Sequence, residues 1–382
     1  MGKKWMLYVA LFVFALARPG WALEMEAGGE SGEEKGGEPK LTFHGYGELH
    51  YNHPVVEGTG FPARDLSPTL DFHRLVLGWS YAFNDRLSLH VEIDFEHATK
   101  EMELEFAYVD FKWIDPVNFR AGSLLMPVGP LNEFHEPTLF YSVERPYVEK
   151  YIIPTSWHEA GVGIYGHIIP GLGYRVYLVE GLNAAGFSEN GIRDGQQVLS
   201  EDSNVAKNFG GVGRVEYTAI PGFALGASFY HAGAGQANPG AGNASVTLWD
   251  ADVRFRMKGI DLTGLYAGTK VKGAAEISAL PAVGQTVGSE QFGWYTEAAY
   301  HLDQVTHAHW DLVPFVRWEA FNTQKEVPAG LIANPATDRK ILTYGLAFYP
   351  DPEVALKIDQ ERWKDGTGAE ENRYNLGLAF MF

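Results

Sequence analysis

The sequence has no cysteine among its 382 residues, which excludes disulfide bonds and thiolate metal sites. Basic residues are scarce, with 30 Lys and Arg against 48 Asp and Glu. A chain with that balance repels nucleic-acid phosphates, so nucleic-acid binding is excluded. Long hydrophobic runs are missing as well. The one apolar run near the start, residues 5–17, is shorter than the about 20 apolar residues that a membrane-spanning helix needs.

The N-terminal segment has the features of a secretory signal peptide. Lys3 and Lys4 precede the apolar run, and Gly20-Trp21-Ala22 follows it with small residues at 20 and 22. We therefore expect a signal peptide over residues 1–22, with a buried N-terminal helix as the alternative. Residues 23–40 are rich in Gly and Glu and cannot bury a core, so we expect a disordered acidic periplasmic linker, or a segment whose acidic residues bind a partner.

From residue 41 to residue 382, apolar and polar residues alternate in one segment after another. Residues 87–96, 353–359 and 373–382 are examples, and this period is typical of strands with two different faces. The segments are about 10 to 13 residues long, which suits a tilted membrane strand better than a globular strand of about 5 or 6. The expected strands begin near residues 41, 70, 86, 101, 117, 160, 172, 209, 223, 246, 260, 291, 310, 340, 353 and 372.

The connections between these segments alternate in length. Tight turns such as 84–85 and 170–171 are followed by longer polar connections such as 184–208 and 364–370. Aromatic residues also gather at the strand ends, where membrane interfaces would lie. These features predict an all-β transmembrane antiparallel barrel of about sixteen strands over residues 41–382. Pro314 inside the thirteenth strand indicates a bulge or a different boundary, because a closed barrel has no edge strand.

One connection, residues 126–158, combines many aromatic residues with several prolines and has neither a helical nor a strand period. An ordinary surface loop is short and polar. We therefore expect this third external loop to fold into the lumen of the barrel. Its polar residues nearest the narrowest point are expected to be Glu133, His135, Glu136, Glu144 and Arg145.

Several stretches carry a resemblance to a known family: FHGYGELHYN at 43–52, DFHRLVLGW at 71–79, the stretch 118–137 and the stretch 142–166. The sequence resembles outer-membrane porins of the phosphate-selective porin O/P superfamily. The resemblance implies a sixteen-stranded, trimeric barrel in the cell outer membrane that passes small hydrophilic solutes or ions. It also implies that Phe382, at the C-terminal aromatic position, is read by the barrel-assembly machinery.

If the apolar residues of each strand face lipid, the charged residues between them face the lumen. An Arg or Lys on the lipid face would cost about 2–4 kcal/mol at mid-membrane, which makes this division clear. The residues expected to line the pore are Arg74, Arg120, Arg175, Arg214, Arg254, Arg256, Arg317, Glu92, Asp94 and Glu96. Fixed charges in a pore set its ion preference. The alternative is that they pair with one another and only solvate the lumen.

The histidines and carboxylates of residues 90–97 raise the question of a metal site. Residues two apart on one strand are separated by about 6–7 Å, which is too far for one small ion without help from a neighbouring strand. We therefore expect no metal and no cofactor. No Ser/His/Asp grouping or phosphate-binding loop stands out, so we expect no enzyme, with an enzymatic barrel as the minor alternative.

The function expected from the sequence is passive diffusion of small hydrophilic solutes and ions through a water-filled channel. One alternative is an anion- or phosphate-selective channel with an arginine-lined lumen. The other is a structural or partner-binding outer-membrane barrel whose lumen is closed by the loop. Because Glu outnumbers Arg and Lys in residues 126–158, the expected pore is weakly selective with a slight cation preference.

Overall fold

The structure is a computed structural model, and it describes residues 40–57, 67–98, 100–197 and 206–382. The expected signal peptide and all but the last residue of the expected linker lie outside these residues. The described residues form sixteen strands. They are β1 Lys40–Glu57, β2 Thr69–Asn84, β3 Leu87–Glu96, β4 Glu101–Ile114, β5 Val117–Leu125, β6 His158–Ile169, β7 Leu172–Glu180, β8 Phe209–Tyr217, β9 Phe223–Gly233, β10 Ser245–Met257, β11 Ile260–Lys272, β12 Glu290–Tyr300, β13 Asp311–Glu326, β14 Asp338–Asp351, β15 Val354–Asp365 and β16 Glu370–Met381. Every strand begins within two residues of the position expected from the sequence.

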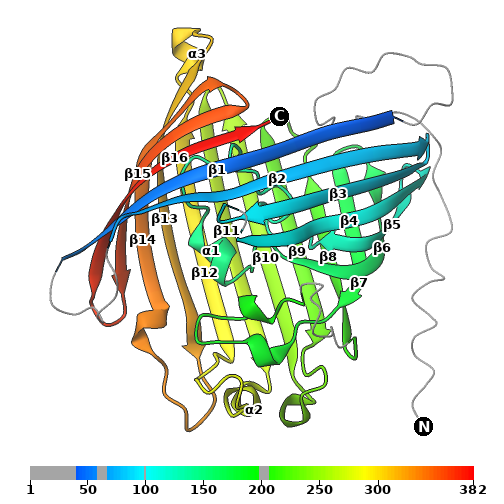
Figure 1. Cartoon of the computed structure of the whole chain (residues 1–382), viewed down its shortest axis with the longest axis vertical. Coiled ribbons are helices and arrows are strands. Elements are labelled where there is room, and N and C mark those ends of the chain that lie inside the picture. Colours follow the sequence, from blue (N-terminus) through cyan, green and yellow to red (C-terminus); the bar gives the residue numbers. More distant parts are fainter. Residues whose placement is uncertain (1–39, 58–66, 99, 198–205) are drawn as a thin grey trace. The chain divides into compact units, whose positions relative to one another are not determined.

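The strands form one closed antiparallel barrel in which each strand pairs with its neighbours in the sequence (Figure 1). The barrel closes where β1 pairs with β16, from Tyr46 opposite Met381 to Glu57 opposite Glu370. Gly45 and Phe382 extend this ladder by exchanging two backbone hydrogen bonds of 3.0 and 2.9 Å. The prediction of a sixteen-stranded, all-β antiparallel barrel is confirmed.

In a water-soluble protein, apolar side chains are buried and charged side chains are exposed. The two faces of this sheet show the reverse, and β15 is the clearest case. Lys357, Asp359 and Glu361 are buried, with exposed fractions of 5%, 4% and 0%, whereas Leu356 and Ile358 are 48% and 52% exposed. Burying charge while exposing aliphatic side chains is unfavourable in water. It is the stable arrangement when the outer face contacts lipid and the inner face is polar.

The connections define two ends of the barrel. The end with the tight turns, which we call the turn end, also carries the start of β1 and the end of β16. The opposite end, the loop end, is where the odd-numbered strands end, and the connections there that are described in full are 126–157, 234–244, 273–289, 327–337 and 366–369. The last of these is a short turn, because the pairing of β15 with β16 continues to Lys364 and Glu370. The prediction of a long loop at 364–370 is therefore wrong.

Short helices lie within the connections. At the loop end they are α1 Tyr147–Tyr151, η1 Ala184–Gly186, η2 Arg193–Gly195, η3 Pro239–Ala241, α2 Ala274–Ser278 and η4 Pro335–Thr337, and at the turn end α3 Asp303–Thr306. None of the helices in the described part of the chain is long and apolar enough to cross a membrane.

Pro314 lies inside β13 and pairs with Leu346 of β14. The pairing of bridge partners between β12 and β13 ends at Ala299 and Phe315, next to the proline. Pro314 itself has no bridge partner on β12, although the Leu302 N–H donates to the Leu312 carbonyl at 3.2 Å just beyond it. The missing N–H of the proline therefore interrupts the ladder on one side of β13 at this residue. The strand boundary expected from the sequence is confirmed, and no bulge is recorded at this residue.

Candidate functional site

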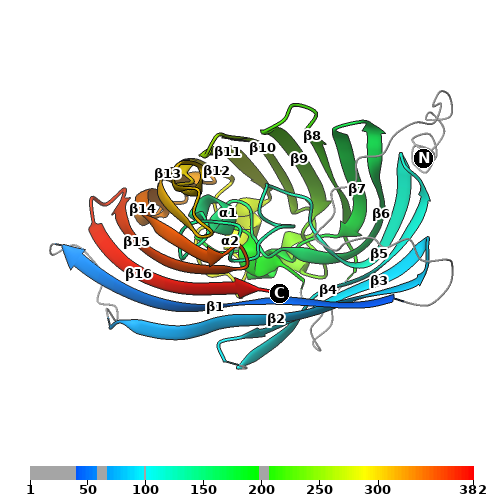
Figure 2. The same ribbon diagram turned by 90° about the horizontal axis from the view of Figure 1, so that it is seen from above.

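The lumen contains residues 126–157, the connection between β5 and β6, which we call the inserted loop. In Figure 2, α1 of this loop lies inside the ring of strands, and α1 contacts β12 and β13. The loop is a packed element, since Val148, Ile152 and Trp157 have no exposed surface. The prediction that this loop folds into the lumen is confirmed.

Three groups of α1 bind the inner wall directly. The Tyr295 hydroxyl on β12 donates to Glu149 Oε1 at 2.6 Å, and the Val148 backbone N–H donates to Glu319 Oε2 on β13 at 3.1 Å. The Tyr147 hydroxyl lies 3.1 Å from Glu361 Oε2 on β15. Since each wall residue is buried, these bonds satisfy polar groups that would otherwise be left without partners.

Two cations on the wall hold the segment before α1. Arg317 on β13 donates from Nη1 to Ser142 Oγ at 2.6 Å and from Nη2 to the Glu144 carbonyl at 3.3 Å. Lys357 on β15 donates to the carbonyls of Pro137 and Ser142, the latter at 2.9 Å. Loop carbonyls thus complete the hydrogen bonding of buried wall charges.

The other side of the inserted loop is held by β1 and β2. Arg74 donates from Nε to Glu48 Oε1 at 2.6 Å and from Nη2 to the His135 carbonyl at 2.8 Å. The His135 ring is 3.0 Å from the Tyr46 hydroxyl and 2.9 Å from Glu105 Oε1. The loop therefore spans the lumen from β1 and β2 to β12, β13 and β15.

Four charged residues of the loop have perturbed pKa values: Glu136, Glu144, Arg145 and Glu149. Burial raises the pKa of Glu149 to about 8 and also raises the pKa of Glu136. Burial acts in the same direction on Glu144, but hydrogen bonding and charge from His50 outweigh it and hold the pKa of Glu144 below its usual range. Burial lowers the pKa of Arg145 to about 10, and the charge of Arg74 adds to this effect. At neutral pH, Glu149 is therefore largely neutral.

The arginines expected to line the pore all lie on the inner face, and each is paired with a carboxylate. The shortest nitrogen–oxygen distances are 3.2 Å or less for the pairs Arg74–Glu48, Arg120–Asp110, Arg175–Glu133, Arg214–Asp252, Arg254–Asp261, Arg256–Asp261 and Arg317–Glu319. Each of these arginines thus has a carboxylate partner, and Arg254 and Arg256 share Asp261.

The three expected acidic wall residues lie on β3. Glu92 is 2.8 Å from His44 Nε2, and Asp94 is 3% exposed with an Oδ1 that has no hydrogen-bond partner in the described ranges. Glu96 is half-buried at the loop end, where it pairs across the sheet with Arg74 and Glu101. The structure therefore spreads these carboxylates along the strand and does not bring them together as one site.

The expected constriction residues have separate partners. Glu133 pairs with Arg175, His135 with Glu105, Glu144 with His50, and the Arg145 guanidinium donates to Ser156 Oγ at 3.1 Å. Glu136 is half-buried. All five stay in the inserted loop, distributed along its length.

Access to the inner wall differs between its two ends. The side chains of Arg317 and Arg74 are 0% and 1% exposed beneath the inserted loop, whereas those of Arg254 and Arg256, near the turn end of β10, are 44% and 52% exposed. Arg175, four residues into β7 from the turn end, is 20% exposed. The inserted loop therefore covers the wall beside β13 and leaves charged side chains near the turn end in contact with solvent.

Two features of the site were not predicted. A second loop packs onto the first: Gln196 donates to the Pro154 carbonyl at 2.7 Å, and the Arg193 guanidinium bonds to the Thr155 carbonyl. Tyrosines on the inner face, Tyr46 and Tyr295, bond to the inserted loop. Both tyrosines stand at strand positions that otherwise carry polar residues, and this pattern in the sequence could have predicted the contacts.

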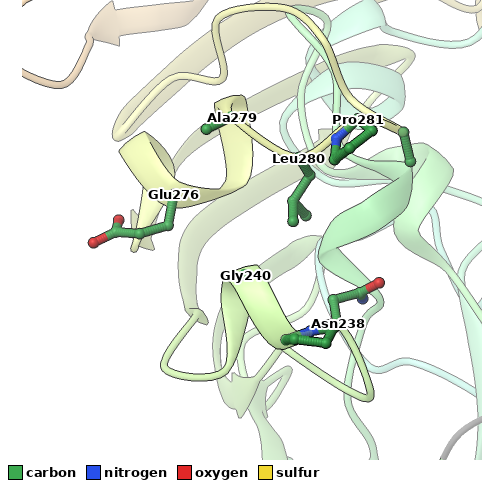
Figure 3. A pocket seen from close by; sticks show the side chains of 8 residues that line it. Asn238, Gly240, Glu276, Ala279, Leu280 and Pro281 are labelled. Carbon is green, nitrogen blue, oxygen red and sulfur yellow. The ribbon is translucent and has the colours of Figure 1, made fainter.

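A cavity of about 480 Å³ lies between η3 and α2 at the loop end (Figure 3). Leu280 and Pro281 line one side, and Asn238, Pro239 and Gly240 the other. Its lining is mostly apolar and carries no cluster of ionisable groups beyond Glu276 among the described residues. It offers nothing that would bind a hydrophilic solute firmly.

Comparisons with known proteins agree with this architecture. The chain is 30% identical over 365 residues to an uncharacterized protein of Aquifex aeolicus, covering 90% of this chain and 80% of that protein. No family model matches the chain.

Solved structures show the same fold. The chain resembles an anion-selective porin from Comamonas acidovorans (TM-score 0.60, 12% identity, 90% of this chain and 100% of that one). It also resembles the outer membrane channel DcaP of Acinetobacter baumannii (TM-score 0.60, 11% identity, 92% and 100%). A third is the trimer form of OmpT, an outer membrane protein of Vibrio cholerae (TM-score 0.55, 12% identity, 90% and 99%). The barrel thus shares the fold of these outer-membrane proteins.

Proposed function

We propose that this chain, which belongs to the same family as the uncharacterized Aquifex aeolicus protein, is an outer-membrane porin for passive diffusion of small hydrophilic solutes and ions. The observation that carries the proposal is the inverted alternation of the strands, with charge inside and aliphatic side chains outside a closed barrel. A closed barrel satisfies every backbone group within the sheet, and a polar interior holds water.

The charge arrangement favours a weakly selective pore. A channel that binds an oxyanion needs arginines free to replace its water with charge-assisted hydrogen bonds. Here the seven wall arginines are already paired with carboxylates of this chain. Compensated pairs in a wet lumen exert little field beyond about 8 Å at physiological salt. This supports a pore with a slight cation preference over a phosphate-selective one.

We assign pore-lining roles by access. The arginines that contact the aqueous path are Arg120, Arg175, Arg254 and Arg256. The buried Arg214 pairs with Asp252 and with Glu216, which also pairs with Arg175. Arg74 and Arg317 instead fix the inserted loop, whose residues Glu133, Glu136 and Arg145 border the narrowest part. Of the three acidic residues on β3, the half-buried Glu96 borders the path, whereas Glu92 and Asp94 are buried in the wall.

The likeness to trimeric and outer-membrane proteins supports two further assignments. We infer that the mature chain is a homotrimer in the outer membrane. The lysines at 3 and 4 and the apolar run 5–17 support export with a cleaved leader over residues 1–22. Phe382, which is 58% exposed and continues the β1–β16 ladder, is positioned to be the signal for the barrel-assembly machinery. No enzymatic activity is proposed.

Planar-bilayer recordings of the purified protein test the function. The expected result is stepwise ohmic conductance with a reversal potential near zero, shifted slightly toward the cation potential in a KCl gradient. A strong anion preference with phosphate block at micromolar concentration would favour the arginine-lined anion channel. Stable insertion without conductance would favour a closed, structural or partner-binding barrel.

A further inference from the structure

Three histidines gather at the loop end of β1, β2 and β3, and one of them, His50, lies 3.4 Å from Glu144 of the inserted loop. His73 stacks on His50 with ring centroids 4.8 Å apart, and the His97 ring lies edge-on to His73 at 5.4 Å. Asp71 completes the group: its Oδ2 is 3.2 Å from His73 Nδ1 and 2.7 Å from His97 Nδ1. One ligand atom from each of Asp71, His73 and His97 lies within 4.8 Å of the other two.

An irregularity in the sheet creates this cluster. Glu48 pairs with Arg74 and Leu49 with Phe72, so His73 is an extra residue in β2, a β-bulge. Without the bulge, His73 and Asp71 would face one side and Arg74 the other. With it, Asp71, which lies opposite the buried His50, shares the inner face with both His73 and Arg74. Bulges of this kind often redirect a side chain at a functional site.

The turn after β3 brings His97 to the bulge. The His97 backbone N–H donates to the His73 carbonyl at 2.9 Å, and Ala98 N–H donates to the Phe72 carbonyl at 3.1 Å. His97 and Ala98 have φ values of +49° and +56°, a region that glycine or asparagine usually occupies in such turns. Two side chains that do not favour this backbone conformation therefore occupy the turn, and one of them is aimed at Asp71.

We propose that Asp71, His73 and His97 form a binding site for one divalent transition-metal cation of the Zn²⁺ class at the loop end of the lumen. Two imidazoles and one carboxylate suit Zn²⁺, Cu²⁺ or Ni²⁺ and do not suit Ca²⁺ or Mg²⁺, which take oxygen ligands. Zn²⁺ binds nitrogen at about 2.0–2.1 Å and carboxylate oxygen at about 2.0–2.2 Å. Ligand atoms already within 4.8 Å of one another reach that geometry by small rotations of the side chains.

The surroundings fit a cation that exchanges with solvent. The Asp71, His73 and His97 side chains are 32%, 30% and 37% exposed, so water can fill the remaining coordination positions. The ring of His50 backs His73 and is itself held by Glu48 Oε2 at 2.9 Å. Such outer contacts orient ligand imidazoles in metal sites. This inference does not depend on the barrel conducting solutes.

A second group at the turn end, His301, Asp303 and Asp311, is the competing location. Both ring nitrogens of His301 are already engaged, Nδ1 with Asp311 Oδ2 at 2.5 Å and Nε2 with the Tyr141 hydroxyl at 3.0 Å. Asp311 Oδ1 also accepts the Asp303 backbone N–H at 3.1 Å. This group therefore ties α3 to the barrel, and it offers one imidazole where the loop-end group offers two.

The test is Zn²⁺ titration calorimetry on the folded, detergent-solubilised full-length protein, prepared without an oligohistidine tag. The expected result is one Zn²⁺ per chain for the wild type. His73→Gln with His97→Asn should weaken binding by 100-fold or more, and Asp71→Asn by 10-fold or more. Asparagine is chosen at residue 97 because it tolerates the positive φ. An unchanged heat-modifiable shift in electrophoresis establishes that each variant is folded.

Two control variants make the result specific. His231→Gln with His309→Gln removes two histidines outside the cluster and should leave Zn²⁺ affinity unchanged. His301→Gln with Asp311→Asn removes the competing group and should also leave it unchanged. Absence of saturable Zn²⁺ binding to the wild type, or equal loss of affinity in either control, would overturn the proposal, as would full affinity in the His73→Gln, His97→Asn variant.

Discussion

The Tyr295 hydroxyl reaches from β12 into the lumen and donates a 2.6 Å hydrogen bond to Glu149, a residue of the inserted loop whose side chain is fully buried. The Leu131 backbone N–H binds the other oxygen of the same carboxyl group at 3.1 Å. One loop residue therefore joins the wall of the barrel to both halves of the loop. Its protonation state is coupled to how firmly the loop is held.

Raising the pH should loosen the inserted loop. The pKa of Glu149 is raised to about 8 by burial, whereas an exposed Glu ionises near about 4.3. The folded loop thus binds the proton more tightly than the released loop. The stabilisation of the folded loop by this proton is complete below a pH of about 4.3 and is lost as the pH rises through about 8. Between these limits, the equilibrium constant for loop opening rises by up to about tenfold per pH unit.

Hydrogen-exchange protection of residues 142–152, corrected for intrinsic rates, measures this effect. Protection in the wild type should fall as the pH rises between those limits. Glu149→Gln, which stays neutral, should keep nearly constant protection, and Glu189→Gln serves as a control for a loop glutamate that remains partly exposed. Parallel pH dependence in Glu149→Gln and the wild type would show that another group governs the loop.

Removing Arg317 should release the inserted loop and destabilise the barrel. Its guanidinium is fully buried and holds Ser142 Oγ, the Glu144 carbonyl and the carboxylate of Glu319. Loss of one partner of a buried ion pair typically costs about 3–5 kcal/mol. Arg317→Ala should therefore lower the free energy of unfolding in urea by about that amount and raise single-channel conductance.

Arg362→Ala is the matched control. Arg362 lies on the exposed face of β15, two strands from β13, with its guanidinium carbon 5.5 Å from the centroid of the Tyr344 ring. Its loss should change neither the unfolding free energy by more than about 1 kcal/mol nor the conductance. Unchanged conductance in Arg317→Ala would mean that the loop is held by its other anchors alone.

The orientation of the barrel can be read by thiol labelling, because the natural chain has no cysteine. Gly242→Cys places a thiol at the loop end, where a Cβ meets nothing within 4 Å. Val305→Cys places one in α3 at the turn end, where the side chain is 63% exposed. A membrane-impermeant maleimide should label only Gly242→Cys in intact cells and both variants after lysis. The reverse pattern would invert the proposed topology.

The accessible arginines at the turn end should affect ion preference. Arg254 and Arg256 both pair with Asp261, which is 2% exposed. Removing both arginines therefore leaves the negative charge of Asp261 without these two partners. Arg254→Gln with Arg256→Gln should increase the K⁺ over Cl⁻ permeability ratio by roughly twofold. Glu133→Gln with Glu216→Gln, which removes the partners of Arg175, should shift the ratio the opposite way. Reversal potentials in a KCl gradient measure both, and no shift in either variant would place these residues outside the conducting path.

The sequence was sufficient for the strands but not for the contacts within the lumen. Alternation of two residue classes is a local pattern, and it located every strand start to within two residues. The aromatic content of 126–158 predicted that this loop folds inward, yet its partners Tyr295, Glu319 and Lys357 come from strands far along the chain. Which wall residues meet the loop depends on how the closed barrel brings distant strands around it.

The cluster of Asp71, His73 and His97 illustrates the same limit. Strand periodicity placed His90, Glu92, Asp94 and Glu96 on one face, and it required a neighbouring strand for any metal site. The neighbouring strand supplies Asp71 and His73, but only because of the bulge at His73, which shifts the register by one residue. Nothing in the local pattern of β1 or β2 marks that shift.

The seam between β1 and β16 makes completion of the barrel the last event in its assembly. Asn52 and Asn375, whose side chains bond at 3.0 Å across this seam, are 323 residues apart in the chain. Until the final strand has been synthesised and delivered, the sheet has two open edges whose unpaired N–H and C=O groups can recruit strands of other molecules. Such non-local pairing is slow, so the unfinished chain must be kept from aggregating throughout its transit. A truncation that removes only β16 should therefore yield insoluble chain rather than a smaller barrel.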